Sequence, residues 1–379
     1  MGGSVPKQNS FSLRIGDLHP SPIREVLKAV ARPGMISFAG GLPSPESFPY
    51  FDLDIPADRL QYGPTEGDED LRCRIAQDLK EISLDVDPEQ ILVISGSQQG
   101  LDLVAKLFID SGTAVAVESP TYLAALQVFR FYGARFASFS PNRLEATFAF
   151  EPPAFLYVIP TFQNPTGYCY SKDERDALAL ACDRQGVTLF EDDPYRDLVY
   201  DPCETTPICA RIRKTSWIYQ GSFSKSLAPG LRLGFLAASP DLVPYLVRLK
   251  QAADLHSNRV SQWLVLKMLE NPERQERLGF LRDLYRRKRD DFSSLLGKYF
   301  SPIASWDIPK GGLFFWLTLK KPVDTRTLLP LALERGVAFM PGEPFYPEPT
   351  VRLGDLRLNF SHASEKEADR GLATLADLF

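Results

Sequence analysis

A repeated strand–turn–helix pattern over residues 91–238 constrains the fold of this chain more than any other feature. Short β-branched or apolar runs end at turn residues and lead into segments with apolar residues at helical spacing. We expect strands at 91–96, 114–119, 155–160, 188–193, 217–223 and 232–238, and helices at 97–108, 120–133 and 172–186. This alternation is typical of a mostly parallel, doubly wound α/β sheet, which binds ligands beyond the carboxyl ends of its strands.

The pattern changes after Pro240, where the large sheet is expected to end. Two long helical stretches follow, and shorter strands then alternate with helices. The expected helices are 240–270, 272–300, 328–336 and 366–379, and the expected strands are 311–319, 336–342 and 355–361. We predict a large α/β domain over 36–245, an interdomain helix over 246–275 and a small α+β domain over 276–379. Residues 1–35, with a short amphipathic helix at 21–30, form an N-terminal arm that packs with the small domain or with a partner subunit.

Composition excludes several classes of protein. The chain has 43 Lys and Arg against 48 Asp and Glu, a net charge of −5, and no basic block, which argues against nucleic acid as a partner. No apolar run approaches the roughly 18 residues needed to span a bilayer, and the first residues lack the apolar core of a signal peptide. We therefore expect a cytoplasmic protein that does not bind membranes.

Cysteine and histidine usage gives no sign of a metal site. The 5 cysteines include no C-x-x-C pair, and the 3 histidines lack metal-ligand spacing. We expect buried thiols rather than a disulfide framework, and no metal. Acid–base chemistry must then come from another type of residue.

The strongest local signal for chemistry is the run Gly221-Ser222-Phe223-Ser224-Lys225 at a strand end. A partly desolvated lysine has a lowered pKa and can condense with an aldehyde as an amine nucleophile. The motif alone is equally consistent with a solvated loop lysine.

Three further motifs close or follow expected strands. A buried carboxylate in Glu191–Tyr195 (EDDPY) needs a cationic partner such as a pyridinium nitrogen, although such a run is more often a cap or a turn. In the turn Gln163–Gly167 (QNPTG), the amide of Asn164 can donate to a phenolate oxygen. Residues 95–100 (SGSQQG) open a helix directly after a strand, where backbone N–H groups and the helix dipole favour a phosphate.

In this order, the motifs resemble the fold-type I pyridoxal-phosphate-dependent aminotransferases of class I and II over nearly the whole chain. The ordered set is far more specific than any member of it. It consists of Ser97 and Gln98, Tyr122, Asn164-Pro165-Thr166-Gly167, Asp192 with Tyr195, Ser222-x-Ser224-Lys225, Arg232 and Arg357. The resemblance implies a mostly parallel seven-stranded sheet in a large domain, a smaller α+β domain, and pyridoxal 5′-phosphate as the cofactor.

The resemblance also implies roles for these residues. Lys225 would bind the cofactor aldehyde covalently and move the substrate proton, and Asp192 would keep the pyridine nitrogen protonated. Asn164 and Tyr195 would hydrogen-bond the 3-oxygen of the ring, while Tyr122 would stack on it. Lys225, Asp192 and Tyr122 are thus the catalytic candidates. The implied phosphate ligands are Ser97, Gln98, Ser222, Ser224 and Arg232.

Substrate contacts follow from the same resemblance. Arg357 looks like the clamp for the substrate α-carboxylate, and Asn164 lies beside it. A tyrosine resembling Tyr62 reaches the cofactor phosphate or the substrate of the neighbouring subunit, which implies a homodimer with shared active sites.

The front of the chain is similar to the 2-aminoadipate and kynurenine aminotransferase branch. The matching segments are 21–28, 37–49 and 250–256. In that branch an arginine matching Arg24 can meet a distal substrate carboxylate, and Gly41 lies near the substrate. Alternatively, Arg24 only covers a helix surface and Gly41 only permits a sharp turn. Residues 140–155 and 201–216 are shorter than usual in the family, which leaves specificity for the substrate side chain open.

The implied activity is a ping-pong amino transfer between an L-amino acid and a 2-oxo acid such as 2-oxoglutarate. The donor is acidic, such as 2-aminoadipate or glutamate, or aromatic or aliphatic. Two alternatives share the fold: another fold-type I enzyme, such as a β-lyase or an aminocyclopropane-carboxylate synthase, and the effector domain of a pyridoxal-phosphate-binding transcription regulator. A purely structural protein fits poorly, since Lys225, Asp192 and Arg357 are all present.

Overall fold

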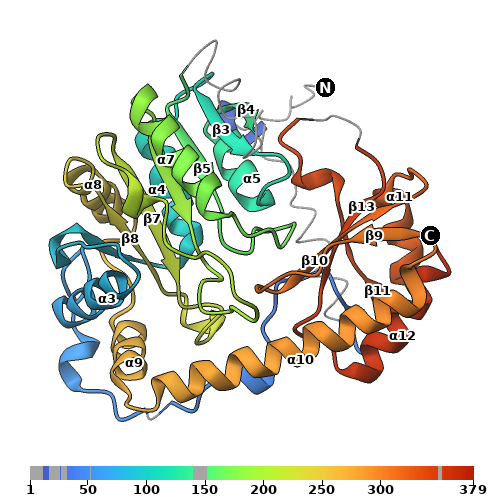
Figure 1. The fold of residues 1–379 in the computed structure, drawn as a ribbon. Helices are drawn as coiled ribbons and strands as arrows, with labels where there is room; N and C mark the ends of the chain where they lie inside the picture. Colours follow the sequence, from blue (N-terminus) through green and yellow to red (C-terminus); the bar gives the residue numbers. More distant parts are fainter. Residues whose placement is uncertain (1–11, 17–25, 27–31, 52, 140–151, 349–351) are drawn as a thin grey trace, which may run out of the picture.

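A computed structural model describes residues 12–16, 26, 32–51, 53–139, 152–348 and 352–379. The described chain forms a large seven-stranded sheet flanked by helices and a smaller four-stranded sheet. The long helix α10 (Arg274–Phe300) runs from beside the large sheet to the small one (Figure 1). The helix expected at 21–30 lies outside the described residues apart from Val26, as does most of 140–155.

The large sheet confirms the expected α/β architecture. Its strand order is β2-β8-β7-β6-β5-β3-β4, in which β8 is antiparallel to both neighbours and the other strands run parallel. The strands are β2 (Ile91–Ile94), β3 (Ala114–Glu118), β4 (Arg135–Phe139), β5 (Phe155–Val158), β6 (Thr188–Asp192), β7 (Trp217–Ser222) and β8 (Gly234–Ala238). The strand pattern did not locate β4. Among the described residues this edge strand pairs only with β3, and it is partly exposed, so it lacks the apolar run of the central strands.

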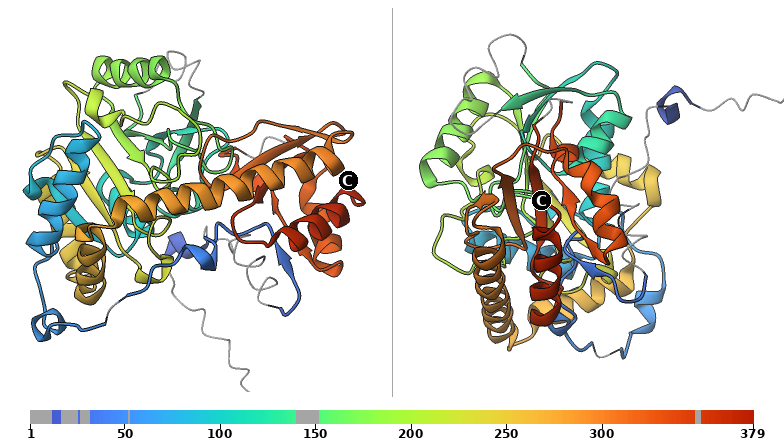
Figure 2. Two further views of the ribbon diagram at one scale, coloured as in Figure 1. Left: turned by 60° about the horizontal axis from the view of Figure 1, so that its bottom comes forward. Right: turned by 90° about the vertical axis from the view of Figure 1, so that its right-hand side faces the viewer.

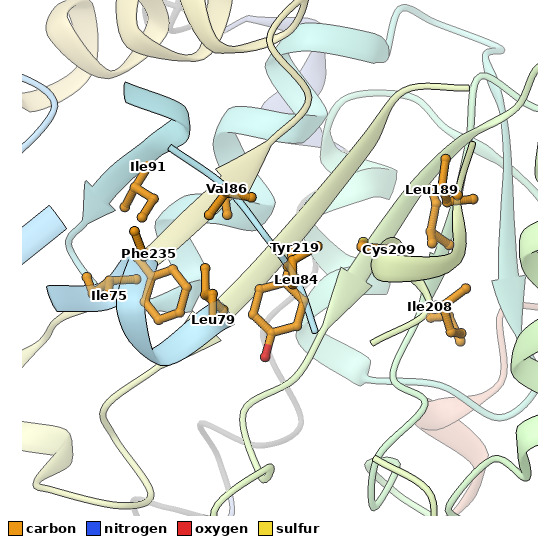
Figure 3. Close-up of a cluster of buried hydrophobic side chains, with 14 of the residues drawn as sticks. Ile75, Leu79, Leu84, Val86, Ile91, Leu189, Ile208, Cys209, Tyr219 and Phe235 are labelled. Carbon is orange, nitrogen blue, oxygen red and sulfur yellow. The ribbon is translucent and has the colours of Figure 1, made fainter. Parts of the chain in front are cut away.

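Helices cover both faces of this sheet because alternate strand residues point to opposite sides. Ile91 and Val93 join the core under α3, α7 and α9, whereas Leu92 and Ile94 join the core under α4, α5 and α8. These helices are α3 (Glu69–Glu81), α4 (Ser97–Phe108), α5 (Leu123–Phe131), α7 (Lys172–Gln185), α8 (Val243–Asp254) and α9 (Arg259–Glu270). Figure 3 shows the first of these cores, with side chains of α3 beside Phe235 of β8.

The small sheet has the order β12-β13-β10-β9. Its strands are β9 (Ala304–Trp306), β10 (Phe314–Leu319), β12 (Met340–Pro341) and β13 (Asp355–Asn359), and its helices are α11 (Thr325–Glu334) and α12 (Glu365–Ala376). Helix α10 packs along α12 (Figure 2) and contributes Phe292, which stacks on Phe315 at 5.6 Å between ring centroids. Near the start of the chain, β1 (Ile36–Ser37) pairs in parallel with β11 (Val337–Ala338).

Two expected elements are divided in the structure. The helical stretch 240–270 is two helices, because Leu255 adopts a left-handed φ of +66° that ends α8. The side chain of Asn258 then accepts from Ser261 N and caps the start of α9. The strand expected at 336–342 is likewise split into β11 and β12. The short helices among the described residues are α1 (Leu13–Gly16), η1 (Pro45–Ser47), η2 (Ala57–Leu60), η3 (Pro88–Gln90), η5 (Cys209–Arg211), η6 (Pro229–Leu231) and η7 (Glu343–Phe345). Within the ranges given above, none of the helices could cross a membrane.

Candidate active site

The predicted site residues converge at the carboxyl edge of the large sheet. A cavity of about 250 Å³ lies there, and Phe314 of β10 and Arg357 of β13 line it from the side of the small sheet. The parallel strands end at this edge, so the turns that follow them meet. The predicted residues in its lining are Gly41, Ser97, Gln98, Tyr122, Asn164, Asp192, Tyr195, Ser222, Ser224, Lys225, Arg232 and Arg357.

Lys225 follows β7 and is half-buried, with its amine in the cavity. Its Nζ donates a hydrogen bond of 2.8 Å to the carbonyl oxygen of Gly41. Burial, and then the positive charges of Arg357 and Arg232, lower the pKa of the Lys225 ammonium to about 8. An amine that loses its proton near neutral pH can act as a nucleophile and as a proton carrier. This environment favours a reactive lysine over a solvated loop lysine.

Asp192 ends β6 and is buried. The hydroxyl of Tyr157 donates to its Oδ2 at 2.8 Å, and the side-chain amide of Gln220 donates to its Oδ1 at 2.8 Å. Burial raises the pKa of Asp192 to about 6, against the lowering effect of these two hydrogen bonds. The carboxylate is thus desolvated and held in one orientation, and a cationic ring nitrogen would compensate its charge.

Arg357 reaches the cavity from β13 of the small sheet. It donates from Nη1 to Asn164 Oδ1 at 2.7 Å and from Nη2 to the Ala39 carbonyl at 2.5 Å. Its guanidinium lies over the ring of Phe314, 4.1 Å from the centroid. Its buried Nε has no hydrogen-bond partner among the described residues. The group therefore keeps a donor for a carboxylate ligand.

Two phenols and one amide form the wall beside Arg357. Burial raises the pKa of Tyr195 and of Tyr122, so both hydroxyls stay protonated at neutral pH. Tyr195 hydrogen-bonds Asn164. Because Asn164 Oδ1 accepts from Arg357, its amide nitrogen remains a donor to the cavity. These groups can bind the phenolic oxygen of a ring.

The opposite end of the cavity suits an anion. Helix α4 begins at Ser97 with Gly96 as its N-cap and no side-chain cap, so its first backbone N–H groups are available to a ligand. Arg232 packs directly against this turn: a Cβ added at Gly96 would lie 2.6 Å from Arg232 Nη2. Gly96 also has a φ of +81°, which disfavours any residue with a side chain.

The ionisable groups lining the cavity fit the cofactor that the resemblance implies. Lys225, Arg232 and Arg357 are cationic there, whereas Asp192 supplies a carboxylate. This surplus of positive charge suits a phosphate at one end and a substrate carboxylate at the other. The hydroxyls of Ser222 and Ser224 lie in the same lining and add hydrogen-bonding groups.

Two predicted residues are not part of this arrangement. Tyr62 is 76% exposed, packs edge-on against His256 at 5.7 Å between ring centroids, and does not line the cavity of its own chain. Arg24 lies outside the described residues.

Tyr157, Gln220 and Phe314 were not predicted as site residues from the sequence. Tyr157 and Gln220 lie within strands, where the sequence pattern indicates hydrophobic-core positions, yet their side chains orient Asp192. A glutamine in the otherwise apolar run Trp217–Gly221 was the one available signal. Across the part of the chain that the structure describes, no cluster of His, Cys, Asp or Glu could hold a metal ion.

Comparisons with known proteins agree with this geometry. The family model for aminotransferase class I and II matches residues 12–375. A 2-aminoadipate transaminase from Thermus thermophilus is 39% identical over 367 residues, which cover 91% of either chain. An aromatic-amino-acid aminotransferase from Thermococcus litoralis is 34% identical and covers 97% of this chain and 93% of its own. The crystal structure of LysN, an α-aminoadipate aminotransferase from Thermus thermophilus complexed with N-(5′-phosphopyridoxyl)-L-leucine, has a TM-score of 0.86 at 36% identity and covers 97% of this chain and 96% of its own.

Proposed function

Because this chain belongs to the aminotransferases of class I and II, which use pyridoxal 5′-phosphate, we propose that its amino donor is an acidic L-amino acid such as 2-aminoadipate or glutamate. Aromatic and aliphatic donors are the second choice, and the acceptor is a 2-oxo acid such as 2-oxoglutarate. The family match confirms the resemblance in the sequence, and the protein is a pyridoxal-phosphate-dependent aminotransferase. The relatives named above do not favour a lyase or a transcription regulator.

The observation that supports amino transfer at this site is the convergence of Lys225, Asp192 and Arg357 on one cavity, and the acidic donor rests on the 39% identity to a 2-aminoadipate transaminase. The amine, the carboxylate and the guanidinium come from three different strands or strand ends, yet each faces the same space. An amine nucleophile, an anion beside a ring nitrogen and a carboxylate clamp are the groups that amino transfer needs.

The roles of these residues follow from their contacts. When bound, the cofactor supplies an electron sink for charge that develops at the substrate Cα. Arg357 binds the substrate α-carboxylate and so fixes the orientation of the Cα–H bond, which lowers the barrier through positioning. Lys225, part of which has lost its proton near neutral pH, takes the Cα proton as general base and returns it as general acid. Asp192 holds the ring nitrogen in its cationic form.

We further propose a homodimer in which Tyr62 contributes to the active site of the neighbouring subunit. The support is the exposure of Tyr62 away from its own cavity and the exposed apolar side chains near it in the sequence, such as Tyr50 at 92% and Leu60 at 73%. Exposed apolar side chains of this size are typical of a protein–protein interface. A cytoplasmic location stays a prediction from the sequence.

A half-reaction with one donor and no acceptor tests the proposed activity. Holoenzyme mixed with glutamate or 2-aminoadipate should release one equivalent of 2-oxo acid per active site, without ammonia. Repeated turnover with release of ammonia would instead identify a lyase. If neither acidic donor reacts while phenylalanine or leucine does, the acidic-donor proposal is wrong although the aminotransferase assignment stands.

Arg24→Ala tests the proposed contact with the distal carboxylate. We expect it to slow the half-reaction with 2-aminoadipate and to leave that with leucine unchanged, because only the acidic donor carries the second charge. Arg32→Ala, an exposed arginine nearby in the sequence, is the matched control. An equal loss with both donors would assign Arg24 a structural role.

A further inference from the structure

Two cysteines meet outside the active site. The side chains of Cys169 and Cys203 interact, although 34 positions separate them in the sequence, and the Cys169 thiol donates to the carbonyl oxygen of Glu204, the residue after Cys203, at 3.2 Å. Both side chains are half-buried. Both also line a second cavity, of about 840 Å³, which shares no lining residue with the active-site cavity. A reagent that enters this second cavity therefore meets both cysteine residues.

A buried cation lies beside one of the two sulfur atoms. Arg175 of α7 is fully buried, and its Nη2 lies 3.8 Å from Cys169 Sγ. The same guanidinium group donates to the carbonyl oxygens of Tyr170 and Glu204, at 3.1 and 3.0 Å. It is thereby fixed in place by the two chain segments that carry the cysteines. A positive charge held next to a sulfur atom stabilises the thiolate.

The two thiols consequently differ in acidity. The hydrogen bond from Cys203, together with the charge of Arg175, lowers the pKa of Cys169 to about 7 against the effect of burial. The hydrogen bond to Cys169 raises the pKa of Cys203. Burial raises the pKa of Cys182 to about 12 and that of Cys209 well above its ordinary value. Cys169 is therefore the thiol set up to react, with Cys203 in contact with it as a second thiol.

We propose that Cys169 and Cys203 form an oxidation site, at which a hydroperoxide converts the two thiols to an intrachain disulfide. The Cys169 thiolate attacks the terminal oxygen of the hydroperoxide. A sulfur–oxygen bond forms, the oxygen–oxygen bond breaks, and the departing alkoxide takes a proton to leave as an alcohol. The sulfur is oxidised by two electrons to a sulfenic acid, and the peroxide is reduced.

Cys203 completes the reaction. Its sulfur attacks the sulfenic sulfur of Cys169, so that the disulfide bond forms and the sulfur–oxygen bond breaks. The leaving hydroxide takes the Cys203 thiol proton and departs as water. A dithiol reverses the change by supplying two hydrogen atoms and becoming a disulfide itself.

The position of the pair links this chemistry to the fold around the active site. Cys169 lies in the segment that returns from the Asn164 turn, where Gln163 N donates to Tyr168 O at 2.8 Å. Cys203 lies in the loop that Arg175 ties to this segment through Glu204 O. The disulfide therefore joins the turn that carries Asn164 covalently to that loop.

Peptide mapping of the holoenzyme tests the proposal. The reduced protein is treated with a small excess of tert-butyl hydroperoxide and digested without reducing agent. We expect one cross-linked peptide pair containing Cys169 and Cys203, lighter by two hydrogen atoms and restored by dithiothreitol. If these cysteines remain unlinked while the hydroperoxide is consumed or other cysteines are oxidised, the proposal is wrong.

Single variants separate the two roles. In Cys203→Ser the sulfenic acid has no thiol to attack it, so dimedone should label Cys169. In Cys169→Ser dimedone should not label Cys203. Cys73→Ser, which changes a half-buried cysteine on α3, is the matched control and should keep the cross-link. Labelling of Cys203 in the absence of Cys169 would overturn the assignment of the reactive thiol.

The pH dependence of Cys169 alkylation distinguishes a thiol with a lowered pKa from one that is merely exposed to the reagent. The Cys203→Ala variant lacks the side-chain donor that lowers the pKa of Cys169, so the midpoint for alkylation of Cys169 should lie above the wild-type midpoint near pH 7. A variant midpoint at or below that of the wild type would contradict the thiol–thiol contact. The titratable and charged groups that face the pair are Arg175, Tyr168, Glu204 and Lys310.

Discussion

The amine of Lys225 and the carboxylate of Asp192 line one cavity, and burial moves their pKa values in opposite directions. That of Lys225 falls to about 8 and that of Asp192 rises to about 6. At pH 7 the carboxylate is therefore mostly ionised, and about a tenth of the amine is already free of its proton. Two groups in one site are thus prepared for opposite tasks, one as a base and one as a fixed anion.

The pH dependence of cofactor capture tests the state of Lys225. Only the neutral amine attacks an aldehyde, so the rate at which the apoenzyme binds pyridoxal 5′-phosphate covalently should rise with pH and level off above about 8. Stopped-flow absorbance measures this rate. A rise centred near the 10.5 of an ordinary lysine would show that the cavity does not perturb the amine.

Tyr157→Phe tests whether the orientation of Asp192 matters. It removes one of two hydrogen bonds to a buried carboxylate, and such bonds contribute about 1.5–3 kcal/mol, so kcat should fall roughly 10-fold or more. Tyr219→Phe is the matched control, because this buried tyrosine donates to Asp193 and does not line the cavity. Equal kcat values in the two variants would contradict the role of Tyr157.

The sequence identified only those site residues that lie in recognisable motifs. Lys225 and Asp192 lie at strand ends within recognisable runs, so their convergence was predictable. Tyr157 and Gln220 act from within strands, where sequence cannot tell a hydrogen-bonding side chain from a core one. The oxidation site was missed for a related reason, since no sequence spacing brings Cys169 and Cys203 together.

Among the structural elements, the start of α4 contributes most directly to the site. Gly96→Ala should weaken cofactor binding roughly 10- to 100-fold, because the new Cβ would displace Arg232, and a hydrogen bond to a charged group contributes about 1.5–3 kcal/mol. Titration of the apoenzyme with pyridoxal 5′-phosphate, followed by fluorescence, measures the dissociation constant.

Gly112→Ala is the control that distinguishes displacement of Arg232 from the backbone strain of a side chain at a positive φ. Gly112 has a similar φ of +87° but nothing within 4 Å of an added Cβ. It precedes β3, so it lies at the amino ends of the parallel strands, away from the active site. This control should lower stability while leaving the affinity for the cofactor unchanged. An equal loss of affinity in both variants would show that strain, not displacement of Arg232, is the cause.

The helices and strands were largely predictable where the local sequence pattern determines their bounds. Helix α4 has the expected bounds because the glycine turn and the apolar spacing both mark them. The edge strand β4 and the break at Leu255 were missed, since a partly exposed strand and a left-handed leucine leave no clear signature. Tertiary pairing, as between β1 and β11, is not encoded locally.

The whole molecule is expected to function as a dimer. Sedimentation should give twice the chain mass of 42.5 kDa. Mixing the variants Lys225→Ala and Tyr62→Ala, both of which are expected to be inactive, tests whether sites are shared. If Tyr62 acts across the interface, half of the dimers are hybrids with one intact site, and activity returns to about a quarter of the wild type. If Tyr62 acts within its own chain, mixing restores nothing.

The most direct test of the account is the identity of the lysine that holds the cofactor. The holoenzyme is reduced with borohydride, digested and mapped by mass spectrometry. We expect a phosphopyridoxyl group on Lys225 and none in the Lys225→Ala variant. A label on another lysine, or no label on a protein that transfers amino groups, would contradict it.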